Sequence, residues 1–245
     1  MISWMSLKNK GTISSWVFLA ATVILLSVVL AVAGGCQRKP KEKGPSTLNL
    51  FKNPGFEKGK KPWTTMATPL WSKSFKVTGA QAHSGQKSAY LEVRSAGQLG
   101  GRVFGVVQEV EPNTFPKVIS GYYRVEKWQK STTLQYLHVA VIADSTDLRG
   151  NYVNHQIRYM LGGIKERPYE IENAKFIVVK SEEPALGKWV QFKRDIAEDF
   201  RKQWGAVPKE FSSIRVLFEA RYEQKKPEEP EVVADVYYDD LYIGP

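Results

Sequence analysis

Cysteine is almost absent from this chain, because Cys36 is the single cysteine among 245 residues. One cysteine excludes an intrachain disulfide and a thiolate metal cluster. The three histidines, His83, His138 and His155, lack metal-ligand spacing such as H-E-x-x-H, and the sequence has no serine or cysteine nucleophile motif. We therefore predict a protein that is not an enzyme.

Positive charge is moderate and locally concentrated. Lys and Arg number 35 against 25 Asp and Glu. Part of the excess lies in Arg38, Lys39, Lys41 and Lys43. A nucleic-acid surface would need basic residues spread over one face with stacking aromatics, whereas a short basic run suits anionic headgroups beside a membrane. The charge pattern predicts membrane contact and no nucleic-acid partner.

Residues 1–35 have the order of a bacterial export signal. Two lysines come first, an almost wholly apolar run extends from residue 13 to residue 33, and small residues precede Cys36. The segment Ala33-Gly34-Gly35-Cys36 resembles the lipobox of bacterial lipoproteins, whose cysteine is diacylated before the signal is removed. We predict a lipoprotein signal peptide over 1–35, with Cys36 as the lipidated residue.

The apolar run is also long enough to span a bilayer as an uncleaved anchor helix. Both alternatives leave the protein tethered to the cell membrane or outer membrane, on the extracytoplasmic face. Residues 36–47 are charged, contain Pro and Gly, and have nothing to bury, so they indicate a flexible basic tether. The folded domain is predicted over 48–245.

The predicted domain is a succession of short apolar runs with strand-like alternation, separated by Gly, Pro, Asn and Ser. The candidate strands are 75–77, 90–93, 103–110, 118–125, 134–142, 155–161, 176–179, 189–192, 214–220 and 232–243. One helix is predicted over 195–204, where apolar residues follow helical spacing before Gly205. Residues 224–231 predict a hairpin tip. This many strands at this spacing indicate an all-β sandwich.

Three motifs in order resemble the galactose-binding-like jelly rolls, especially carbohydrate-binding modules attached to cellulases and xylanases. The first is N-P-G-F-E at 53–57, followed by Trp63; the second is H-S-G at 83–85 leading into an apolar strand; the third is Y-Y-D-D-L at 237–241. The resemblance implies a jelly-roll β-sandwich. The segment 152–183 matches no part of the family pattern.

The same resemblance implies a structural Ca²⁺ site. Its ligands would be Glu57, one of Asp239 and Asp240, and oxygens near Asn53 and Gly85. Oxygen ligands suit Ca²⁺. Regular strand alternation allows only one of the two aspartates to point at the site, and we favour Asp240. The alternative is that these acids are ordinary surface carboxylates paired with lysines.

Sugar-binding faces stack pyranose rings on exposed aromatic side chains beside polar groups. The candidate carbohydrate-binding residues are Trp71, Tyr122, Tyr123, Trp128 and Tyr152. Each of them has a plain alternative, since large aromatic side chains are mostly buried.

Glu219 and Glu223 share one face of a regular strand, which is a feature of jelly-roll glycosidases. Arg221 stands between them, so we predict ion pairs instead of a catalytic acid and nucleophile. The sequence thus predicts a non-catalytic, glycan-binding lipoprotein. The alternative is an envelope protein that uses the same fold to bind a protein partner.

Overall fold

The computed structural model describes residues 49–72 and 74–245, all within a unit that extends from Lys43 to Pro245. Cys36, the predicted signal or anchor helix and the whole predicted tether lie outside the described residues. Ten strands and one helix follow one another along the chain. They are β1 (Lys76–Thr78), β2 (Ser88–Arg94), β3 (Gly100–Val110), β4 (Val118–Gln129), β5 (Gln135–Ser145), β6 (His155–Gly162), β7 (Ala174–Val178), β8 (Trp189–Asp195), α1 (Ile196–Trp204), β9 (Phe211–Lys225) and β10 (Val233–Gly244).

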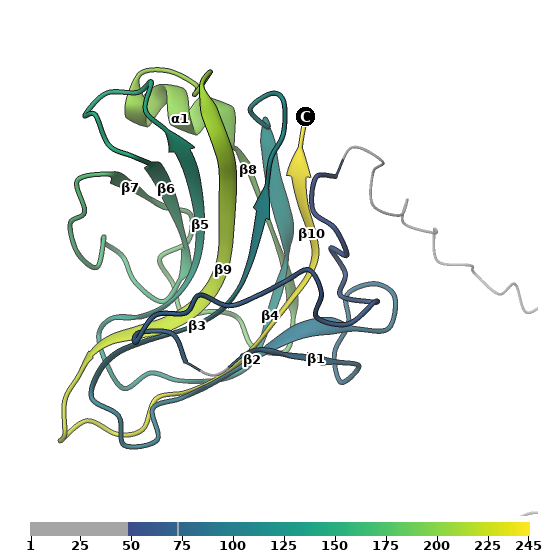
Figure 1. Cartoon of the computed structure of the whole chain (residues 1–245). Helices are drawn as coiled ribbons and strands as arrows, with labels where there is room; N and C mark the ends of the chain where they lie inside the picture. Colours follow the sequence, from purple (N-terminus) through teal and green to yellow (C-terminus); the bar gives the residue numbers. More distant parts are fainter. Residues whose placement is uncertain (1–48, 73) are drawn as a thin grey trace, which may run out of the picture. The chain divides into compact units, whose positions relative to one another are not determined.

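The strands form two five-stranded sheets that pack face to face as a jelly-roll β-sandwich (Figure 1). One sheet has the order β1-β2-β10-β4-β8, and is called the β10 sheet below. The other has the order β3-β9-β5-β6-β7, and is called the β9 sheet. Neighbouring strands are antiparallel, apart from the parallel pair β6 and β7. The predicted all-β fold is confirmed, and every predicted strand corresponds to an observed one.

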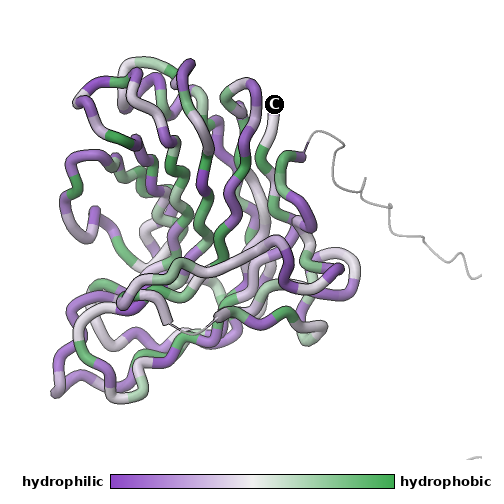
Figure 2. Tube along the Cα trace, in the orientation of Figure 1, coloured by the Kyte–Doolittle hydropathy of each residue, from purple (hydrophilic) through white to green (hydrophobic). Residues whose placement is uncertain are grey.

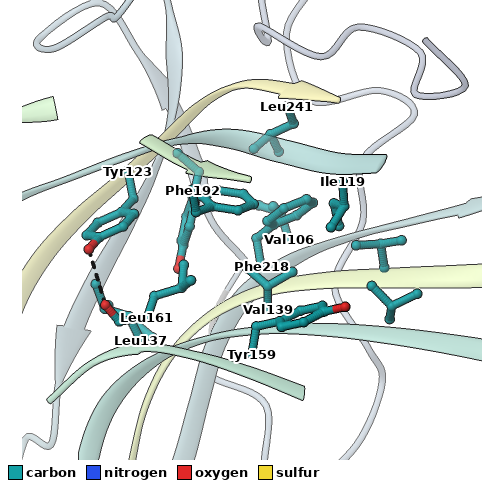
Figure 3. Close-up of a cluster of buried hydrophobic side chains, with 14 of the residues drawn as sticks. Val106, Ile119, Tyr123, Leu137, Val139, Tyr159, Leu161, Phe192, Phe218 and Leu241 are labelled. Carbon is teal, nitrogen blue, oxygen red and sulfur yellow. Dashed lines mark hydrogen bonds between the residues drawn. The ribbon is translucent and has the colours of Figure 1, made fainter. Parts of the chain in front are cut away.

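Alternation explains why these segments pair as strands. Along β4, buried and partly exposed side chains alternate from Val118 to Glu126. In Figure 2 the hydrophobic colour is concentrated in the strands, while the loops are mostly hydrophilic. Figure 3 shows the resulting core, in which Ile119, Phe192 and Leu241 of the β10 sheet face Val106, Val139 and Phe218 of the β9 sheet.

The short helix α1 forms as the sequence predicts. The Asp195 side chain caps its first turn by accepting a hydrogen bond from the Glu198 backbone N–H at 2.9 Å. Gly205 ends it with a φ of 88°. Phe200 and Trp204 are buried, so the apolar side of α1 packs on the sandwich core. None of the helices in the described residues is long and apolar enough to cross a membrane.

Two loops cover the β9 sheet on its outer face, the face turned away from the core. Residues 64–72 run along the edge of β3, where Thr64 and Trp71 form isolated bridges with Val107 and Val103. Residues 163–173 connect β6 to β7, and Tyr169 within them lies against Phe176 of β7. These two loops position the side chains of the candidate site.

Candidate functional site on the outer face of the β9 sheet

Three charged side chains of β9 lie in a row on the outer face. Glu219, Arg221 and Glu223 alternate with Phe218, Ala220 and Tyr222, which belong to the core. Arg221 donates from Nη1 to Glu219 at 3.3 Å and from Nε to Glu223 at 3.0 Å. The predicted ion pairs of Arg221 are therefore confirmed.

His138 lies beside Glu219 on the neighbouring strand β5. Its Nδ1 is 2.9 Å from Glu219 Oε2, and both side chains are buried. Burial lowers the pKa of His138 to about 4. Burial alone would raise the pKa of Glu219, but contact with His138 and the charge of Arg221 lower it to about 2. At neutral pH Glu219 is thus ionised and accepts a hydrogen bond from the neutral imidazole.

Arg158 of β6 and Tyr169 of the 163–173 loop extend this group of polar side chains. The group, called the network below, consists of Glu219, Arg221, Glu223, His138, Arg158 and Tyr169, with Tyr136 beside it. Arg158 donates to the Tyr169 hydroxyl at 2.9 Å and to Gln156 Oε1. The guanidinium of Arg221 lies over the rings of Tyr136 and Tyr169, at 5.7 and 5.6 Å from their centroids. Such cation–π contacts are strong where water is excluded.

Trp71 borders the network from the other loop. Its indole lies against Gly105 of β3, whose register partner on β9 is Glu219. A Cβ at position 105 would lie 3.0 Å from the Trp71 ring, so only glycine leaves room for the indole there. Trp71 and Met66 are partly exposed and pack on a small apolar cluster of the outer face.

The network is charge-balanced and almost closed to solvent. Two carboxylates, Glu219 and Glu223, are matched by the guanidinium groups of Arg158 and Arg221. Glu219 is 2% exposed and Arg221 8% exposed, although both lie on an outer face. The Nε2 atom of His138 is buried and has no hydrogen-bond partner among the described residues. A closed polar cluster with an unpaired acceptor calls for a ligand or an ordered water.

The predicted calcium ligands gather at a different place, at one end of the β10 sheet. Glu57 Oε1 accepts hydrogen bonds from the backbone N–H groups of Gln86 and Lys87, both at 2.9 Å. Asp239 Oδ2 accepts from the backbone of His83 at 2.7 Å. Gly85 packs so closely on Glu57 that a Cβ there would lie 2.4 Å from its carboxylate.

Both aspartates point into this corner, which corrects the expectation that only one can. A register shift between Asp239 and Tyr242 breaks the strand alternation, and Asp240 adopts a φ of 48°. Asp240 contacts the His83 ring and the Ser84 hydroxyl, both at 2.6 Å. Burial raises the pKa of Asp239 to about 7, and the nearby charge of Asp240 adds to this shift.

These residues supply the hard oxygen donors that Ca²⁺ prefers. The carboxylates of Glu57, Asp239 and Asp240 nevertheless accept hydrogen bonds from loop residues, and the carbonyl of Asn53 accepts one from Trp63 at 2.8 Å. The described residues hold no group of three or more His, Cys, Asp or Glu arranged for a metal ion. The calcium site stays a prediction.

The five aromatic residues predicted to bind carbohydrate do not form one site. Tyr123 is buried in the core and donates a hydrogen bond to the Leu161 carbonyl, so its ring is not available for stacking, which corrects that prediction (Figure 3). Trp128 packs partly against the core beside Gly163. Tyr152 packs near Trp204 of α1.

The remaining two candidates lie on outer faces. Tyr122 is on the outer face of the β10 sheet, where its ring stacks on His83 at 3.6 Å between centroids. Trp71 is the one predicted aromatic residue beside the network of the β9 sheet. Sequence reasoning missed Tyr136 and Tyr169 as parts of that network. Along β5, Tyr136 is one of the alternate residues that face outward. This position suggests a role in the network only when β5 is known to lie next to Glu219 and Arg221 of β9.

The fold defines the chain as a jelly-roll β-sandwich. A model of a protein family of unknown function, DUF3047, matches residues 151–226, the segment that contains Arg158, Tyr169, Glu219, Arg221 and Glu223. The comparison with curated proteins gave no significant match.

Several solved structures of carbohydrate-binding modules are similar. One is TmCBM61 in complex with β-1,4-galactotriose, with 18% identity, a TM-score of 0.43, and coverage of 80% of this chain and 97% of that chain. A second is the CBM22-1 xylan-binding domain of Paenibacillus barcinonensis Xyn10C, with 16% identity, a TM-score of 0.43, and coverage of 78% and 90%. A third is CBM28, a module specific for non-crystalline cellulose, with 9% identity, a TM-score of 0.41, and coverage of 79% and 94%.

Proposed function

We propose that the sandwich binds a neutral glycan on the outer face of the β9 sheet. The observation that carries the proposal is the closed network of Glu219, Arg221, Glu223 and Arg158, with Trp71 at its border. Sugar recognition needs a few convergent polar groups and an aromatic surface. Charge balance within the network favours a ligand without net charge, because an ionic ligand would leave one buried charge uncompensated.

The network also offers hydrogen-bond groups of both kinds. Carboxylate oxygens of Glu219 and Glu223 accept from sugar hydroxyls, and the guanidinium groups of Arg158 and Arg221 donate to them. The unpaired Nε2 of His138 is a further acceptor. A hydroxyl-rich ligand satisfies such a set better than an apolar one, since an unpaired buried polar atom costs free energy.

A glycan array with the detergent-solubilised full chain tests this function, followed by titration of the best neutral glycan. Trp71→Ala should weaken binding about fivefold or more, because stacking on an aromatic ring contributes on the order of 1 kcal/mol or more. Trp189→Ala is the matched control, because Trp189 is a partly exposed tryptophan of β8 on the other sheet. This variant should bind the glycan as the wild type does.

Absence of binding to every glycan by a folded sample would refute the proposal. It would favour the alternative, in which the sandwich binds an envelope protein. Direct binding to a purified partner protein would then have to establish that function. Equal losses in Trp71→Ala and Trp189→Ala would place the binding site elsewhere.

We also propose that the chain is a lipoprotein anchored through Cys36. The support is the order of charge, apolar run and small residues before this single cysteine. Metabolic labelling with a palmitate analogue should label the wild type and leave Cys36→Ser unlabelled. Equal labelling of both, or none in the wild type, would contradict lipidation at Cys36.

A further inference from the structure

Tyr169 blocks the proposed glycan site with its own side chain. Its hydroxyl lies 2.9 Å from Arg158 Nη1, and its ring lies 5.6 Å from the Arg221 guanidinium. These are the two cationic donors that a bound sugar would use. A phenol shares with a sugar the hydroxyl group that accepts a hydrogen bond from a guanidinium. In the described structure Tyr169 therefore stands where a ligand would make its contacts.

The loop that carries Tyr169 is weakly attached between its ends. Its first residue, Gly163, donates a backbone hydrogen bond to the Glu182 carbonyl at 2.8 Å, and near its other end Ile171 accepts one from Ala174 at 3.1 Å. Among the described residues, the backbone of 164–170 makes no hydrogen bond to another segment. Segments with few backbone hydrogen bonds open at low free energy.

Side chains hold the loop down at two places. Ile164 is 5% exposed and packs with Tyr136 and Met160, while Tyr169 packs on Phe176 and the arginines. Between these two contacts Lys165, Glu166 and Arg167 are exposed. The inner side of the loop thus carries Ile164 and Tyr169, and its outer side is charged, as expected of a segment that can move away from the sheet into water.

We propose that residues 163–173 are a lid on the glycan site, and that Tyr169 is its latch. This inference rests on the proposed function for its ligand, and the cover itself can be tested without a ligand. A glycan must displace Tyr169 from Arg158 and Arg221 before it binds. The apparent affinity is then the affinity of the open form multiplied by the fraction of molecules that are open.

Arginine modification by phenylglyoxal measures the cover directly in the full chain. Peptide mapping should show slow reaction at Arg158 and Arg221 in the wild type, relative to Arg94 of the β10 sheet. Tyr169→Phe keeps the ring and loses the hydrogen bond to Arg158, and it should raise the reactivity of both arginines roughly tenfold, since a hydrogen bond to a charged group shifts an equilibrium by about that factor. Tyr169→Ala should raise it further.

Tyr242→Phe is the matched control, because its hydroxyl bonds only the Pro245 carbonyl, at 3.3 Å, in the described structure. It should leave all these reactivities unchanged. Unchanged reactivity of Arg158 and Arg221 in Tyr169→Phe and Tyr169→Ala, with melting curves like the wild type, would overturn the lid.

Glycan kinetics give the second readout. With a glycan that binds the wild type, Tyr169→Phe should raise the association rate constant several-fold. A lower affinity with an unchanged association rate would make Tyr169 a ligand contact and overturn its role as a latch. If no glycan binds any variant while arginine reactivity rises as predicted, the lid stands and the proposed ligand class fails.

Discussion

Two ion pairs, one on the outer face of each sheet, use the same residue types in opposite ways. On the β10 sheet, Lys76 pairs with Glu92 while their side chains stay 63% and 45% exposed. On the β9 sheet, Arg221 pairs with Glu219 while the two side chains are 9% and 3% exposed. Ion pairs in water are worth little, whereas buried ones depend strongly on both partners. The loops 64–72 and 163–173 cover the outer face of the β9 sheet, so its charged side chains are shielded from water and form a closed polar site.

The largest expected effect comes from removing the cation at the centre of the closed face. Arg221→Met should lower the free energy of unfolding by about 3–5 kcal/mol, because it leaves the buried Glu219 carboxylate without its cationic partner. Urea unfolding of the wild type and the variant measures the difference. A loss below about 1 kcal/mol would mean that the β9 face is as well solvated as the β10 face.

Acid should weaken the same face next. The folded-state pKa of His138, about 4, lies below its ordinary value of 6.5, so the unfolded chain binds the proton more readily between these values. The free energy of unfolding should therefore fall as pH falls from about 6.5 to 4, by about 2–3 kcal/mol, since one pKa unit corresponds to about 1.4 kcal/mol. Glu219, with its lowered pKa, adds a further loss between its ordinary value of 4.5 and about 2.

Unfolding at a series of pH values measures this slope. His138→Gln should flatten it between pH 6.5 and 4, whatever its effect on stability at neutral pH. A variant that keeps the full wild-type slope would show that another group is responsible.

Calcium should have an intermediate effect on stability, through the predicted site at the end of the β10 sheet where Asp239 is buried. The raised pKa of Asp239 leaves it largely protonated below about pH 7, and a protonated carboxyl is a poor ligand. If Ca²⁺ binds there, a saturating concentration should stabilise the protein by about 1–3 kcal/mol at pH 8 and by less at pH 5. Thermal unfolding with Ca²⁺ and with chelator measures this. No shift at either pH, or the same shift in Asp240→Asn, would contradict the predicted site.

The smallest effect belongs to the exposed pair of the β10 face. Lys76→Met should change the free energy of unfolding by about 1 kcal/mol or less, and the difference should vanish in 1 M salt, where the screening length is about 3 Å. Urea unfolding at low and high salt measures both values. A larger loss that persists in salt would erase the contrast between the two faces.

Much of the fold was predictable because alternation is a local property. The ten strands, the helix before Gly205 and the hairpin tip all follow from patterns within about 15 residues. The shared face of Glu219, Arg221 and Glu223 was predictable for the same reason. The convergence of Glu57 with the last strand is not a local property, and it was predicted only because the family resemblance implied it. Bulges are not visible in such patterns, so the orientation of Asp239 beside Asp240 was missed.

The candidate site depends on contacts that local patterns do not contain. Tyr122 and Tyr123 are adjacent, and only the position of the second sheet decides that Tyr123 enters the core. Tyr169 lies in the segment that matched no family pattern, and its role follows from the arginines that β6 and β9 place beneath it. Trp71 was predicted from its aromatic character, whereas its location follows from the bridge to Val103 and the absence of a side chain at Gly105.

Hydrogen–deuterium exchange with and without a glycan selected on the array tests the central claim most directly, because it compares both faces in one experiment. The account predicts that ligand binding changes exchange in residues 64–72 and 163–176, which border the β9 face, and leaves the β1, β2 and β10 segments of the other face unchanged. Protection confined to the outer face of the β10 sheet would contradict the account and move the glycan site to the opposite side of the sandwich.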